Sequence, residues 1–117
     1  MKIMLSILSV LLLACTAPKT EMPTEILSET AFANILKEIH LAEAIFELNK
    51  SKGLGNARNT LANNYQAIYK KHDTSASTFS KSLDYYAKNP EKLEKIYSTI
   101  LEELNQGRTT LSQQETN

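Results

Sequence analysis

The feature that most constrains this chain is its one cysteine, Cys15, which follows an apolar run at the start of the sequence. Lys2 gives that run a positive beginning, Ile3–Leu13 is apolar apart from serines, and Ala14 is a small residue directly before the cysteine. This order matches a bacterial lipoprotein signal peptide, in which the cysteine is acylated and becomes the new N-terminus. The run is shorter than the about 20 apolar residues of a membrane-spanning helix. We therefore expect residues 1–14 to be removed and Cys15 to be the lipidation site.

An acylated cysteine forms no disulfide, so packing alone has to hold the mature domain together. Removal of residues 1–14 from the 117-residue chain leaves 103 residues, enough for one small domain. Loss of Lys2 leaves 12 basic and 13 acidic residues, a formal charge of −1. Because a chain so close to neutral lacks a positive field, we expect no nucleic-acid partner. The absence of Trp and the three Gly and three Pro favour a helical core over a turn-rich β-sandwich.

The residues after the cysteine bear on the location of the protein. Thr16 stands where an aspartate would retain a lipoprotein in the inner membrane, and this favours the outer membrane. Residues 16–20 contain no acidic cluster of the kind that marks export to the cell surface, so the periplasmic face is expected. Residues 15–25, with Pro18 and Pro23, are expected to form an extended lipidated tether. At about 3.1 Å per residue such a tether reaches roughly 30 Å.

Apolar residues recur at helical spacing through the rest of the chain. Four helices are predicted, and their approximate ranges are 29–50, 57–71, 75–88 and 90–106. Ser28 is the expected N-cap of the first helix, and Asn89-Pro90 is a strong start signal for the fourth. Gly53-Leu54-Gly55 is predicted to form the loop between the first two helices.

Four helices with short connections predict an all-α domain at residues 26–107. The third helix is much shorter than the first, so we expect a small irregular bundle rather than a symmetric one. Gly107 is the expected C-cap of the last helix. Residues 108–117 are polar and are expected to be disordered.

Short motifs between His72 and Leu104 have the order and spacing of a known family. They are Lys71-His72, Thr78-Phe79, Ser82-Leu83, Tyr85-Tyr86, Asn89-Pro90 and Ile96-Tyr97. With Ile39–Ala44 and the cysteine motif, the chain resembles a family of short Bacteroidota lipoproteins, domain of unknown function 4296. The resemblance covers nearly the whole mature chain and departs from the family at Asp73, where a glycine is expected. It implies the helical fold and the envelope location, and it brings no catalytic residues.

Three ionisable residues, His40, Glu43 and Glu47, fall together at the edge of the core stripe of the first helix. A buried carboxylate is costly unless it is hydrogen-bonded, so we expect tyrosine hydroxyls from the later helices to bond this group. The i, i+3 and i, i+4 spacings can also present His and Glu to one metal ion. The favoured interpretation is a polar network that fixes helix register. Ligand or metal binding is the alternative, and we expect neither a resident metal nor a cofactor.

Leu41, Ile45 and Leu48 form a second apolar group on the other side of the first helix. A helix that is apolar on two sides either lies at the centre of a bundle or has one side covered by a partner. We therefore predict that this group belongs to the core or to an interface with another protein.

The predicted third helix buries Phe79, Leu83 and Tyr86 at helical spacing. Tyr85 lies about 100° from this face, aligned with Ser82, and is expected at the surface. A surface tyrosine is a frequent interface anchor, although single apolar groups on a surface are also normal. Tyr85 is therefore a candidate interface residue.

No serine or threonine stands beside a recognisable base, and we expect no enzymatic activity. The preferred function is that of a non-enzymatic, lipid-anchored protein that faces the periplasm and binds another envelope protein. The alternative is a lipoprotein that binds a small molecule or a metal through His40, Glu43 and Glu47.

Overall fold

Residues 24–116 are described in this computed structural model, and they form four helices and no strand. The helices are α2 (Glu29–Asn49), α3 (Leu54–Lys71), α4 (Ala76–Ala87) and α5 (Pro90–Glu115). The prediction of an all-α fold is therefore confirmed. The expected signal peptide, Cys15 and most of the expected tether lie outside the described residues. None of the described helices is long and apolar enough to cross a membrane.

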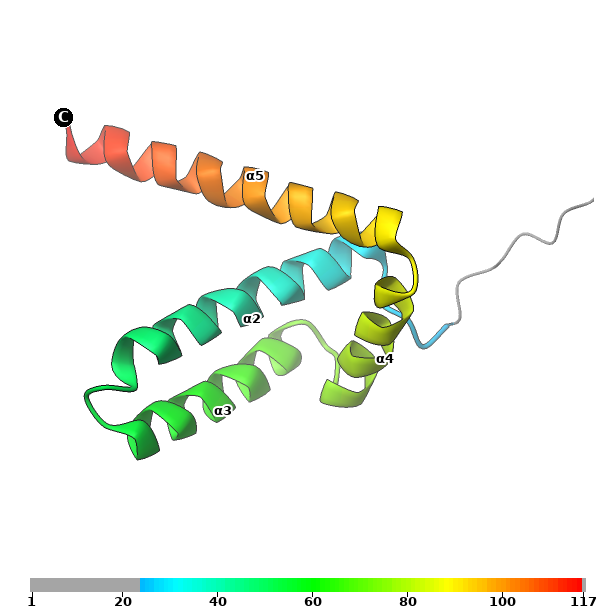
Figure 1. The fold of residues 1–117 in the computed structure, drawn as a ribbon, viewed down its shortest axis with the longest axis horizontal. Coiled ribbons are helices and arrows are strands. Elements are labelled where there is room, and N and C mark those ends of the chain that lie inside the picture. Colours follow the sequence, from blue (N-terminus) through cyan, green and yellow to red (C-terminus); the bar gives the residue numbers. More distant parts are fainter. Residues whose placement is uncertain (1–23, 117) are drawn as a thin grey trace, which may run out of the picture.

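The helices form an irregular bundle around α2. α2 and α3 make an antiparallel hairpin, and the short α4 lies near the N-terminal end of α2 (Figure 1). α5 starts beside that same end and runs in the same general direction as α2, but the two helices diverge toward their C-terminal ends (Figure 1). α2 packs against α3 and α5, and α4 packs against α5. The buried residues of α2, from Phe32 to Ala42, lie in its N-terminal two-thirds.

Serine side chains cap two of the helices. The Oγ of Ser28 accepts a hydrogen bond from the Ala31 N–H at 3.2 Å, and the Oγ of Ser75 accepts one from the Thr78 N–H at 3.1 Å. The N–H groups of a first turn have no partner within the helix, so each cap satisfies one of them. The predicted starts of α2 and α4 are confirmed.

α3 begins earlier than the sequence predicted. Gly53 is its N-cap, and Leu54 and Gly55 belong to its first turn. The prediction that all three residues form a loop is therefore wrong. The first N–H groups of a helix make no intrahelical bonds, so a glycine costs less there than in the middle of a helix.

The turn from α3 to α4 is a Schellman motif. The Thr74 N–H donates to the carbonyl of Tyr69 at 2.9 Å, and the Asp73 N–H donates to that of Lys70 at 3.2 Å. Asp73 has a φ of 49°, in the left-handed region that favours glycine. This conformation explains why a glycine was expected here, and aspartate adopts it more readily than most residues do.

α5 does not end at Gly107 but continues to Glu115. The prediction of a disordered tail is therefore wrong for residues 108–115. The apolar stripe of α5 continues past the glycine, because Leu111 follows Leu104 at a spacing of seven residues. We call residues 101–115 the α5 extension, and every residue in it is exposed.

The core centres on Phe32, which is fully buried. Its ring stacks on those of Tyr86 and Phe79, with centroids 4.7 and 5.4 Å apart. Aliphatic side chains complete the core, chiefly Ile35, Leu36, Ile39, Ile68, Ile96 and Ile100. Such aromatic pairs add about 0.5–1.5 kcal/mol each beyond the area they bury.

The backbone of Leu27 is bound by two side chains of α4. The Leu27 N–H donates to the Oγ of Ser82 at 2.9 Å, and the Tyr86 hydroxyl donates to the Leu27 carbonyl at 2.7 Å. Both α4 residues are fully buried. We call this arrangement the Leu27 clasp. An ion pair between Lys81 and Glu25 holds the same segment at the surface.

The buried face of α4 differs from the predicted one. Ser82 is buried beside Phe79 and Tyr86, whereas Leu83 is exposed. The spacing of apolar residues predicts that Leu83 is buried. It cannot predict the burial of Ser82, which depends on a hydrogen bond with the backbone of another segment.

Loss of the Tyr86 hydroxyl tests the clasp. Tyr86→Phe keeps the stacked ring but leaves the Leu27 carbonyl without this donor, so we expect a loss of about 1–2 kcal/mol of unfolding free energy. This corresponds to a melting temperature lower by roughly 5 °C or more in thermal circular dichroism. Tyr97→Phe is the matched control, because Tyr97 is partly exposed. An equal effect of the two substitutions would contradict this role.

Candidate functional site

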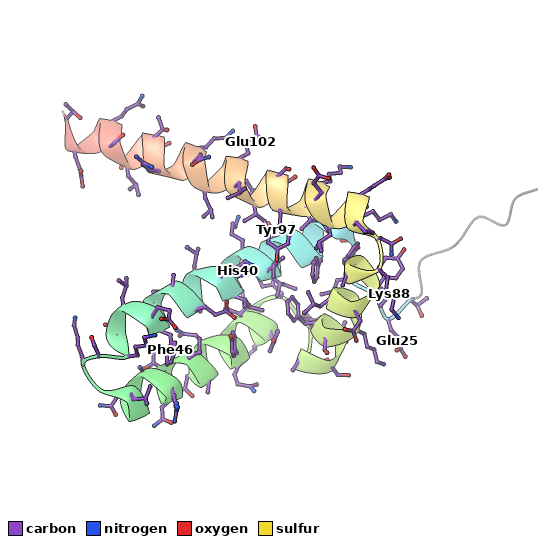
Figure 2. All side chains as sticks on the ribbon, in the orientation of Figure 1. Glu25, His40, Phe46, Lys88, Tyr97 and Glu102 are labelled. Atoms are coloured by element: carbon purple, nitrogen blue, oxygen red, sulfur yellow. The ribbon has the colours of Figure 1, made fainter. Side chains whose placement is uncertain are left out.

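The predicted polar network exists in part. His40 Nδ1 lies 3.4 Å from Glu43 Oε2, and the Tyr65 hydroxyl of α3 donates to Glu43 Oε1 at 2.8 Å. The expected tyrosine hydroxyl is therefore present. His40 also contacts α5, where its ring centroid lies 6.0 Å from that of Tyr97 (Figure 2).

Glu47 does not join this network. It forms an ion pair with Lys50, one turn along α2. The side chains of His40 and Glu43 are both nearly half-exposed, so Glu43 is not the buried carboxylate that the helical wheel suggested. Within residues 24–116 no three His, Cys, Asp or Glu side chains are grouped so that they could hold a metal ion. The geometry is that of a polar contact between α2 and α3.

Burial raises the pKa of Tyr65 to about 12, and its hydrogen bond to Glu43 acts in the same direction. The hydroxyl therefore stays protonated at neutral pH and serves as a donor to the Glu43 carboxylate. Its ring stacks on that of Tyr69 at a centroid distance of 6.5 Å. Tyr65 thus fixes the register of α3 on α2.

A second polar contact joins the C-terminal end of α3 to α2. Glu38 Oε1 accepts from Lys71 Nζ at 2.8 Å and lies 3.0 Å from His72 Nε2. His72 is the C-cap of α3. The hydrogen bond from Lys71 lowers the pKa of Glu38 below its usual value, burial opposes this shift, and the contact with His72 adds to it.

The lowered pKa of Glu38 predicts a pH dependence of stability. A carboxyl group with a lower pKa in the folded state adds stability above its unfolded pKa of about 4.3, and this contribution is lost as the pH falls through the folded value. Glu38→Gln should therefore lower the unfolding free energy at pH 7 by about 0.5–1 kcal/mol. Urea titrations should show that the difference shrinks below about pH 4. Glu47→Gln is the control, and a difference that does not change with pH would contradict the assignment.

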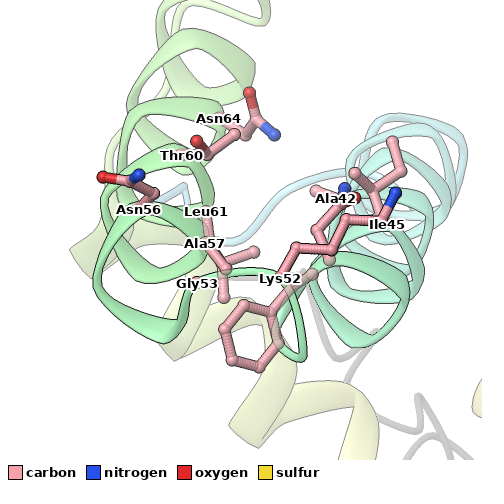
Figure 3. A pocket seen from close by; sticks show the side chains of 11 residues that line it. Ala42, Ile45, Lys52, Gly53, Asn56, Ala57, Thr60, Leu61 and Asn64 are labelled. Carbon is pink, nitrogen blue, oxygen red and sulfur yellow. The ribbon is translucent and has the colours of Figure 1, made fainter.

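A small cavity lies between the C-terminal half of α2 and the N-terminal half of α3 (Figure 3). Its volume is about 200 Å³, and Asn56, Thr60 and Asn64 give it a polar rim. Ligand pockets are usually about 300–1,000 Å³ in volume, so this cavity is small for an organic ligand.

Several large apolar side chains of α2 and α5 are exposed to solvent. Leu41 is 46% exposed and Leu48 75% exposed, and Ile45 between them is also about half-exposed. The second apolar side of α2 is therefore not part of the core. α5 contributes Leu104 and Leu111 from the extension, of which Leu111 is 64% exposed.

Leu41, Leu104 and Leu111 line a groove of about 570 Å³ between the two helices, whereas Ile45 and Leu48 lie further along α2, outside the groove lining. An ion pair between Lys37 and Glu103, 2.5 Å long, joins α2 to α5 beside it. The groove is lined by Lys37, Leu41, Glu103, Leu104, Gly107, Arg108, Leu111, Ser112 and Glu115. Helical spacing predicts the apolar side of α2, which includes Leu41. A glycine is a common helix C-cap, so the sequence does not predict the part of the groove that α5 forms beyond Gly107.

Tyr85 lies elsewhere, where α4 meets α5. It is half-buried rather than exposed, because its ring packs edge-on against Tyr86 at a centroid distance of 5.1 Å. The ammonium group of Lys92 lies 5.6 Å from the centre of the Tyr85 ring. The structure therefore does not bring Tyr85 together with the apolar side of α2, and its role at an interface stays a prediction.

Comparison with known families gives a match over most of the chain. The family described as "Domain of unknown function (DUF4296)" matches residues 23–110. This chain belongs to the DUF4296 family. No curated protein and no solved structure matches it significantly. The match starts just before α2 and ends within the α5 extension, so it includes most of the groove lining but not Leu111, Ser112 and Glu115.

The contacts in the structure give a physical meaning to the motifs seen in the sequence. Phe79, Ser82 and Tyr86 form the buried face of α4 in this DUF4296 domain, and two of them make the Leu27 clasp. Asn89 donates from its side chain to the Tyr85 carbonyl at 2.7 Å, and so ties the end of α4 to the start of α5. These motif residues therefore stabilise the packing of α4 and its connection to α5.

Proposed function

We propose that this DUF4296 protein is a non-enzymatic, lipid-anchored envelope protein whose helical domain binds another protein. The observation that carries the proposal is the groove between α2 and α5, where exposed leucines of two helices face a shared space. The sequence motif at Cys15 supports the lipid anchor, and the residues after it favour the periplasmic face of the outer membrane.

The exposed aliphatic groups are too many for an inert surface. Leu41, Ile45 and Leu48 lie along one side of α2, and Leu104 and Leu111 lie opposite on α5. Complete burial of one such side chain contributes about 1.5–3 kcal/mol. Monomeric proteins rarely expose large contiguous apolar patches, and patches with a polar rim mark interaction sites. Lys37, Arg108 and Glu115 supply such a rim here.

The shape of the groove indicates the kind of partner. Two diverging helices with apolar inner sides can accept a third helix whose apolar residues recur every three to four positions. This mode of recognition needs no charged anchor and no cofactor, in keeping with the near-neutral chain. We therefore propose a helical segment of another polypeptide as the bound element.

Substitution of Cys15 tests the anchor. Cys15→Ala should abolish acyl labelling and release the protein from the membrane fraction, because several acyl chains otherwise hold it there. Metabolic labelling with a fatty-acid analogue, followed by fractionation, measures both effects. Cys15→Ala chains that still carry label would show that the lipid anchor lies elsewhere.

Substitution of exposed leucines of α2 tests whether this side of the helix binds a partner. Leu41→Gln and Leu48→Gln should leave the melting temperature within about 2 °C of the parent, because surface substitutions usually change stability by under about 0.5 kcal/mol. Both should reduce protein crosslinks in the native envelope, quantified by mass spectrometry.

Leu54→Gln is the matched control, since Leu54 is as exposed as Leu41 but lies outside the groove at the start of α3. Equal crosslinking by all three variants would refute the apolar side of α2 as the binding surface. Tyr85→Ala is a weaker test, because Tyr85 packs on Tyr86 and its removal is expected to lower stability as well.

A further inference from the structure

We propose that the outer side of α3 rests on a bilayer surface that carries anionic headgroups, so that the anchored domain is held in one orientation. This inference rests on the lipid anchor of the proposed function, because it assigns the side of the domain that faces the membrane. Three observations support it: the separation of charge along the chain, the unpaired cations of α3, and the polar character of its outer side.

The near-neutral charge of the chain results from two regions of opposite charge. Residues 48–72, which include the end of α2 and the whole of α3, contain five basic residues and no acidic residue. The rest of the described chain, residues 24–47 and 73–116, contains six basic and 12 acidic residues. α3 is therefore the positive element of a domain that is otherwise acidic. An anionic partner is attracted to this helix and repelled by the rest of the surface.

Most of the cations in residues 48–72 are not neutralised by a neighbour. Two of the five form ion pairs with glutamates of α2. The other three, Lys52, Arg58 and Lys70, are exposed, and none of them forms an ion pair with another residue of 24–116. Asp73 lines the same shallow surface hollow as Lys70 but does not pair with it. These three side chains are therefore available to an external anion.

The outer side of α3 is polar. At about 100° per residue, Lys70 points away from the buried Ala57 and Ile68, and Arg58 lies at the flank of the same side. Leu54, in the first turn, is the one exposed large apolar residue of α3. The other residues of the outer side are exposed and have amide or small side chains: Asn59, Ala62, Asn63 and Gln66.

These features favour a lipid surface over an acidic protein as the anionic partner. Protein interfaces usually have an apolar or aromatic centre, and the outer side of α3 has none. Arg58 and Lys70 lie roughly 18 Å apart along the helix, so they would contact separate phosphates. Anionic bilayers attract such dispersed basic groups over about one Debye length, without insertion of the helix. Because acyl chains already attach the protein, the charges set its orientation.

The position of α3 in the bundle gives this orientation a consequence for the groove. α2 packs against both α3 and α5, and α3 lies on the side of α2 away from α5 (Figure 1). With α3 against the lipid headgroups, α5 lies on the side of α2 that is remote from the bilayer. The groove between α2 and α5 then stays accessible to a helical segment of another polypeptide.

Energy transfer from the protein to labelled lipid tests this orientation. Once Cys15 is acylated, a cysteine introduced elsewhere is the only free thiol and can carry a donor dye. Asn63→Cys places the dye on the outer side of α3, and Ser98→Cys places it on α5, opposite the buried Ile96 and Ile100. The mature lipidated protein is reconstituted into vesicles with an acceptor on the headgroups. One set contains phosphatidylethanolamine with about 30% phosphatidylglycerol, and the other contains phosphatidylcholine alone.

We expect transfer from position 63 to exceed transfer from position 98 at least threefold in the anionic vesicles. This excess should fall at least twofold in phosphatidylcholine vesicles, and also at high salt, because mobile ions screen the attraction. Arg58→Gln combined with Lys70→Gln should reduce it to the same extent. Lys88→Gln combined with Arg108→Gln is the matched control, because it removes the same two charges from exposed, unpaired positions outside α3. The control should leave the excess unchanged.

Equal transfer from the two labels in anionic vesicles, or equal effects of the two double variants, would overturn the inference. It would also fail if Arg58→Gln with Lys70→Gln left the transfer unchanged but lost crosslinks to an envelope protein, because the outer side of α3 would then bind an acidic protein. Each of these results leaves the proposed function standing, since acyl labelling at Cys15 and the crosslinks of the α2 leucine variants test it separately.

Discussion

The architecture depends on one side chain, Tyr86, which joins three parts of the chain. Its ring stacks on Phe32 of α2, and its hydroxyl binds the Leu27 carbonyl just before α2. Asn89, three residues later, ties the end of α4 to the start of α5. The position of α5 therefore follows from the seating of α4 on the beginning of α2. Because this anchoring acts at one end only, α2 and α5 are free to diverge at the other.

Much of the fold followed from local chemistry that is visible in the sequence. Ser28 and Ser75 cap helices because first-turn N–H groups need acceptors, and Pro90 can begin a helix because its missing N–H has no role there. The errors have a common physical origin. Ser82 is buried because it bonds the distant Leu27 backbone, and the helix passes through Gly107 although that residue is a common terminator. The local sequence pattern shows neither the distant partner of Ser82 nor the continuation of α5 past Gly107.

The candidate site was also predictable only where it depends on local chemistry. The partnership of Glu43 with a tyrosine followed from the cost of a buried carboxylate, although the structure leaves that carboxylate half-exposed. The apolar side of α2 was recognised from its periodicity, which cannot distinguish a core face from an interface. Only the structure shows that Leu41 lines an open groove between α2 and α5 and that Leu48 stays exposed.

The Leu27 clasp has a consequence for the way the protein would lie on a bilayer. It places the start of the domain beside α4, at the end of the molecule opposite the C-terminus of α5 (Figure 1). If Cys15 carries the proposed lipid anchor, the domain is therefore held by its α4 end. The C-terminal half of α5 would then point away from the point of attachment, and the groove between α2 and α5 would open on the side far from it.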